Sequence, residues 1–87
     1  MAHQPDFLVL EERKSQAEEL LGHPIFGEAV RALRQSYFER IESCSAGDEA
    51  RLRIEHLKLK MLAELVSQLQ QFVNDYKFAA KRKEKAA

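Results

Sequence analysis

Only a few residues of this 87-residue chain are of types that perform chemistry. The three histidines, His3, His23 and His56, are far apart, and none has a partner three or four residues away that completes a metal-ligand motif. Cys44 is the only cysteine, which excludes an internal disulfide and a cysteine-based zinc site. It falls on the apolar side of a predicted helix end, so a packed thiol is favoured over a nucleophile.

The carboxylates and glycines form no catalytic pattern either. The glutamates of residues 11–19 match a solvated helix face, and Arg51 with Glu55 is an i,i+4 pair typical of a helix surface. The glycines fit neither the dinucleotide-binding nor the P-loop pattern. Because a chain this short also leaves little room for a walled pocket, we predict a non-enzymatic protein without cofactor or metal.

Charge is balanced overall but unevenly distributed. Fourteen basic residues match fourteen acidic ones, so no global field attracts nucleic acid or membrane. Residues 1–21 hold two basic and five acidic groups, whereas one acidic residue accompanies the five basic residues of the C-terminus. These five are candidates for contacts with nucleic-acid phosphates, or they serve only solubility and the helix C-terminus: Lys77, Lys81, Arg82, Lys83 and Lys85.

Glycine, proline and capping residues divide the chain into three predicted helices, at about 7–21, 24–43 and 49–80. Gly22 is expected to close the first helix in a left-handed conformation, and Pro24 to open the second at its first position. Pro24 also favours an extended conformation for His23, which we interpret as a capping or surface residue. Asp48 is a predicted cap of the third helix.

Apolar periodicity predicts how these helices pack. A stripe on the second helix is typical of one apolar face, and the short loop before residue 49 places the second and third helices antiparallel. The third helix carries two adjacent apolar rows, enough to contact two neighbours. The predicted fold is all-α: a short N-terminal helix plus a long antiparallel helical hairpin, resembling a three-helix bundle.

The lengths of the helices predict self-association. The third helix is expected to be roughly 48 Å long and the second roughly 30 Å, so the C-terminal half of the third extends beyond its partner. The first helix can cover part of that half, and a second copy of the chain the rest. The predicted oligomer or partner interface consists of Leu65, Leu69, Phe72, Val73 and Tyr76.

We predict one helical domain over residues 1–80 and a disordered basic tail over 81–87, which lacks an apolar face. The apolar runs are too short to span a bilayer, and the N-terminal residues do not match a signal peptide. The expected location is therefore the cytoplasm.

The stretches "AEELLGHPIFGEAVRALRQSYFERIES" and "EHLKLKMLAELVSQLQQFVNDYKFAAK" carry a resemblance. Over residues 17–80 the chain resembles short helical proteins of tailed bacteriophages and prophages, encoded among head-assembly and DNA-packaging genes. Their pattern is a leucine pair, a break before Pro-[Leu/Ile]-Phe, a mid-helix aromatic residue and a final Lys-[Leu/Phe]-Ala. The corresponding residues are Leu20, Leu21, Pro24, Ile25, Phe26, Tyr37, Lys77, Phe78 and Ala79.

The resemblance implies a viral context, in the host cytoplasm or associated with the virion, but assigns no role to any residue. One expected function is a helical assembly protein of virion assembly or DNA packaging, which self-associates and docks to larger packaging or head proteins. The alternatives are a DNA-binding packaging factor similar to small terminase subunits, or a small inhibitor of a host protein. The second helix begins "PIFGEAV", apolar and acidic where a recognition helix needs base-reading groups. Non-specific DNA contact through the basic residues remains open.

Overall fold

The computed structural model describes residues 6–86 and is helical throughout that range apart from Asp6 and two short connections. Helix α1 spans Phe7–Leu21, α2 spans Pro24–Glu42 and α3 spans Glu49–Ala86, and residues 6–86 contain no strand. The predicted all-α class is confirmed. All three helices begin at the predicted residues, because the signals that start them are local.

The break between α1 and α2 is a helix cap. His23 is extended, with φ −76° and ψ 125°, and its Nδ1 accepts a hydrogen bond from the Ile25 N–H at 3.3 Å. Pro24 occupies the first turn of α2, where a missing N–H leaves no helical hydrogen bond unmade. The capping role predicted for His23 is confirmed.

The prediction of a left-handed Gly22 is wrong. Gly22 has φ −86° and ψ −5°, and its N–H continues α1 by donating to the carbonyl of Glu18. The chain turns at the extended His23, so no positive φ is needed there. The positive φ lies at Gly47, at 106°, just before the Asp48 side chain accepts the N–H of Arg51 at 3.4 Å and caps α3.

Helix α3 is longer than predicted. It continues to Ala86 instead of ending near residue 80, so residues 81–86, predicted to be disordered, are helical; Ala87 lies outside the described residues. Lysine, arginine, glutamate and alanine are good helix formers, and basic side chains are favoured in a last turn by the helix dipole. Lys83 also contacts α1, with its Nζ 4.3 Å from the centre of the Phe7 ring.

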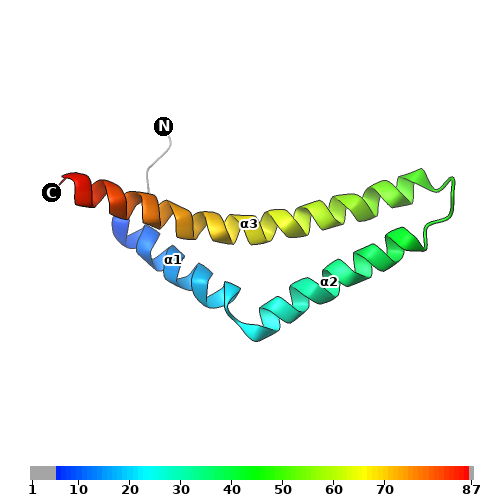
Figure 1. Cartoon of the computed structure of the whole chain (residues 1–87), viewed down its shortest axis with the longest axis horizontal. Helices are drawn as coiled ribbons and strands as arrows, with labels where there is room; N and C mark the ends of the chain where they lie inside the picture. Colours follow the sequence, from blue (N-terminus) through cyan, green and yellow to red (C-terminus); the bar gives the residue numbers. More distant parts are fainter. Residues whose placement is uncertain (1–5, 87) are drawn as a thin grey trace.

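Helices α1 and α2 lie one after the other along the same side of α3 (Figure 1). Helix α1 packs on the C-terminal half of α3 and α2 on its N-terminal half, while α1 and α2 share few contacts. The described helices therefore form a flat plate. The thickness of the chain, 18 Å in extents of 61 × 33 × 18 Å, is less than twice the diameter of one helix.

The hydrophobic core of this plate is thin. The radius of gyration is 18.1 Å, against about 12 Å for a compact domain of this length. Among the described residues only Ala17 and Val73 are buried apolar residues, at 3% and 4% exposure, and no large side chain is fully buried. A monomer that buries so little apolar surface is marginally stable.

Candidate interaction surfaces

One row of α3 residues faces α1 and α2, and we call it the α3 seam. Its members alternate at spacings of three and four residues, and each is buried or half-buried. The row starts against α2 and ends against α1. It consists of Leu52, Glu55, Leu59, Leu62, Val66, Leu69, Val73, Tyr76 and Ala80.

Helix α1 covers much of the predicted interface. Val73 is buried, and the Tyr76 ring lies 5.4 Å from the Phe7 ring and 5.1 Å from Lys14 Nζ. The prediction assigned Val73 and Tyr76 to an interface with another chain, whereas the structure places them against α1 of the same chain. It underestimated α1, whose basic side chains Arg13 and Lys14 lie over the Phe72 and Tyr76 rings.

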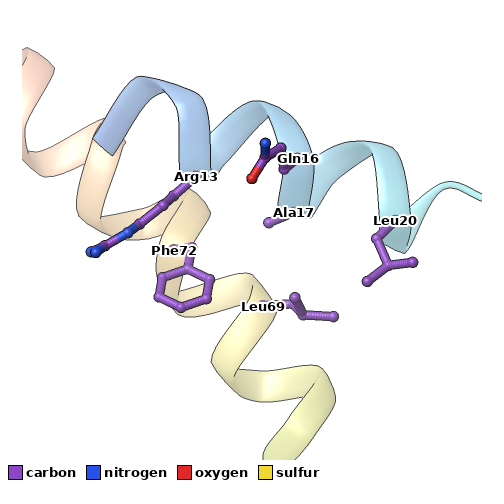
Figure 2. A pocket seen from close by; sticks show the side chains of 6 residues that line it. All are labelled: Arg13, Gln16, Ala17, Leu20, Leu69 and Phe72. Atoms are coloured by element: carbon purple, nitrogen blue, oxygen red, sulfur yellow. The ribbon is translucent and has the colours of Figure 1, made fainter. Parts of the chain in front are cut away.

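The rest of the predicted interface lies beside a hollow between α1 and α3. Figure 2 shows the side chains of Leu69 and Phe72 on α3 opposite Leu20 and Arg13 on α1. The guanidinium carbon of Arg13 is 5.8 Å from the centre of the Phe72 ring. The hollow measures about 230 Å³, below the about 300–1,000 Å³ of small-molecule pockets, so it suits a side chain better than a substrate. It is lined by Arg13, Gln16, Ala17, Leu20, Leu69 and Phe72.

A second apolar row on α3 is open to solvent, and we call it the α3 stripe: Ile54, Leu57, Met61 and Leu65. These side chains are 51% to 66% exposed. Leu65 was predicted to lie at an interface, but the other three were missed by the sequence reasoning. Their spacing of three, four and four residues could have indicated this apolar row on α3.

Glu55 is the one buried charged residue among those described. Its carboxylate lies 3.8 Å from Arg40 Nη1 of α2 and 3.2 Å from Lys58 Nζ. Its Oε2 atom accepts no hydrogen bond from any group within residues 6–86. The predicted surface pair between Arg51 and Glu55 is therefore wrong, because Glu55 points into the seam and pairs across helices.

All five predicted phosphate-contacting residues are exposed, and one of them, Lys83, contacts α1. Lys77, Lys81 and Lys85 recur every four residues and so form one row on helical α3. Lys77 and Lys81 border a shallow hollow with Asn74 and the exposed Phe78. Arg82 is exposed near this row, whereas Lys83 lies over the Phe7 ring.

The remaining candidate residues form no site. His56 is exposed, the Cys44 side chain is half-buried, and His3 lies outside the described residues. Residues 6–86 contain no group of three or more potential metal ligands. Within the same range, no helix combines the length and the apolar content of a membrane span.

Comparison with models of protein families, with curated proteins and with solved structures gave no match. The interaction surfaces themselves therefore carry the functional argument. They comprise the α3 stripe, the hollow between α1 and α3, and the basic row at the end of α3.

Proposed function

We propose that this protein is a non-enzymatic helical assembly module that works by self-association and by docking to larger proteins. The observation that carries the proposal is the distribution of apolar side chains. Eleven large apolar residues are exposed among those described, whereas only Ala17 and Val73 are buried apolar residues. Burial of a Leu, Ile, Phe or Met side chain stabilises by about 1.5 to 3 kcal/mol, so association would stabilise this chain substantially.

The biological setting we propose is virion assembly or DNA packaging of a tailed bacteriophage. This setting rests on the sequence resemblance over residues 17–80. The flat, elongated shape is compatible with it, since a plate with two open faces can contact more than one neighbour. The same proposal includes docking of this chain to a larger packaging or head protein.

Self-association is expected to be measurable on the purified full chain. Sedimentation velocity across a hundredfold range of protein concentration should show reversible oligomers, and the melting temperature should rise with concentration by mass action. A chain that stays monomeric throughout this range, with a constant melting temperature, would contradict the self-association on which the module depends.

Weak DNA binding is a second candidate function, favoured by the row of Lys77, Lys81 and Lys85. We expect duplex DNA of unrelated sequences to bind equally and more weakly as salt rises. Replacing Lys77 and Lys81 by glutamine should flatten the slope of log affinity against log salt by about two units.

The matched control for this test is the double change of Arg31 and Arg34 to glutamine, which removes the same charge from α2. Both arginines are exposed and distant in sequence from the basic row. If the control variant loses as much affinity as the lysine variant, or if the wild type binds no DNA at low salt, the basic row is not a DNA-binding surface.

A further inference from the structure

The α3 stripe lies on a broad face of the plate and not on its edge. Ile54, Met61 and Leu65 each directly precede a residue of the α3 seam, and one residue is 100° of helix rotation. The seam points within the plane of the plate, toward α1 and α2. The stripe is therefore a quarter turn away from that plane, on a face that none of the three described helices covers.

The hollow between α1 and α3 continues the stripe. Phe72 is seven residues, or about two turns, beyond Leu65, and it directly precedes Val73 of the seam. Arg13 and Leu20 also directly precede the half-buried Lys14 and Leu21 of α1, so they reach the same face as Phe72 (Figure 2). The stripe and the hollow together make one apolar surface, open at Ile54 and recessed at Phe72.

Charged residues beside the stripe change sign along α3. Apart from Glu49 and Arg82 near the ends of α3, the charged residues of one flank are Arg53, Lys60, Glu64 and Asp75, which are separated by seven, four and eleven residues, all close to whole numbers of turns. The first two are basic and the last two acidic. In an antiparallel pair of identical helices each flank meets the same flank in reversed order, so the basic half meets the acidic half. A parallel pair would instead bring this flank against the other flank of the partner helix, so these opposite charges would not meet.

The apolar and charged positions specify the same register. Residue 63 is the midpoint of Met61 and Leu65, and also of Ile54 and Phe72. The midpoints of the two opposite-charge pairs, Lys60 with Glu64 and Arg53 with Asp75, fall within one residue of it. A surface that matches itself about one point in both apolar shape and charge fits a two-fold axis, the commonest symmetry of homodimers.

We propose that α3 pairs antiparallel with α3 of a second copy of this chain, about a two-fold axis beside residue 63. Met61 packs against the partner's Leu65, and Ile54 enters the hollow beside the partner's Phe72. Lys60 pairs with the partner's Glu64. This inference rests on the proposed function and specifies the surface through which self-association occurs.

The test compares Met61→Glu with Leu8→Glu in the full chain. Met61 is 66% exposed and Leu8 is 69% exposed, so both changes introduce the same charge at a site the monomer tolerates. Leu8 lies nine residues before the buried Ala17, a rotation of half a turn, so it points away from α3 and not onto the face that carries the stripe. In sedimentation velocity we expect Met61→Glu to raise the dimer dissociation constant about 30-fold or more, with Leu8→Glu close to wild type.

Two outcomes separate this inference from the function on which it rests. If the wild type associates but Met61→Glu associates equally well, the stripe is not the interface, while assembly through another surface stands. If the wild type does not associate at all, both the inference and the self-association it depends on are wrong. Circular dichroism of each variant verifies that the helices are intact.

A charge exchange tests the antiparallel register. Lys60→Glu alone and Glu64→Lys alone are each expected to weaken dimerisation about three- to tenfold, because each places like charges across the axis. The double variant restores opposite charges and should return to near wild-type affinity. Additive losses in the double variant would overturn the antiparallel register.

Discussion

Replacing Val73 by glutamate is expected to detach α1 from α3. Val73 is 4% exposed and lies between Phe72 and Tyr76, both of which contact α1. A glutamate there would bury an unpaired charge, at a cost of about 3 to 5 kcal/mol in the free energy of unfolding. That is a large part of the about 4 to 13 kcal/mol typical of a domain this size.

The detached α1 should lose its helix, since isolated helices of about 12 to 15 residues are marginal in water. Helix α1 contributes about one fifth of the helical residues, so the circular dichroism signal at 222 nm should fall by a similar fraction. Phe78→Glu is the matched control, because Phe78 is on the same helix but 65% exposed. Equal stability of the two variants would show that α1 does not depend on Val73.

The helices could be predicted from the sequence because their boundaries depend on local chemistry. His23 caps α2 through a hydrogen bond to a residue two positions away, and Asp48 caps α3 in the same local way. Pro24 fixes its own backbone whatever surrounds it. Gly22 was mispredicted because two neighbouring residues could supply the turn, and the extended His23 supplied it.

The end of α3 was predicted wrongly because the prediction relied on apolar periodicity. Residues 81–86 have no apolar face of their own, but their helix propensity is high and they extend a helix that has already formed. Extension needs no new nucleation. Lys83 then reaches Phe7 by a contact between distant parts of the chain that no local pattern specifies.

Which apolar row is covered depends on the placement of α1 and was only partly predictable. The sequence predicted two apolar rows on α3, but the prediction underestimated how much of them α1 covers. Lys14 lies over the Tyr76 ring, and hydropathy scales count such a lysine as polar throughout. Ile54, Leu57 and Met61 of the α3 stripe were overlooked, and their exposure follows from the arrangement of all three helices.

The burial of Glu55, a charged residue, could not be predicted from the sequence either. Its side chain is 6% exposed at a seam position, although its neighbours in sequence suggested a surface ion pair. The partner that contacts it across the seam, Arg40, is on another helix. No spacing within α3 contains that information, so only the three-dimensional arrangement identifies Glu55 as a buried charge.

Replacing Glu55 by leucine is expected to stabilise the chain by about 1 to 3 kcal/mol. The native carboxylate is removed from water, one of its oxygens accepts no hydrogen bond, and its nearest Arg40 contact is a long 3.8 Å. The ionic contacts of a buried charged group often return less free energy than the removal of that group from water costs. Arg40 and Lys58 have side chains 49% and 42% exposed, so both cations remain solvated when Glu55 is lost.

Urea denaturation of wild type, Glu55→Leu and Glu28→Leu measures this effect. Glu28 is an exposed glutamate of α2, so the same chemical change there should alter stability by about 0.5 kcal/mol or less. A gain confined to Glu55→Leu would mean that the carboxylate is retained at a cost in stability, as expected if it fixes the register of α2 on α3. A loss of stability in Glu55→Leu would instead show that the contacts with Arg40 and Lys58 outweigh the desolvation of the carboxylate, and that Glu55 holds α2 and α3 together.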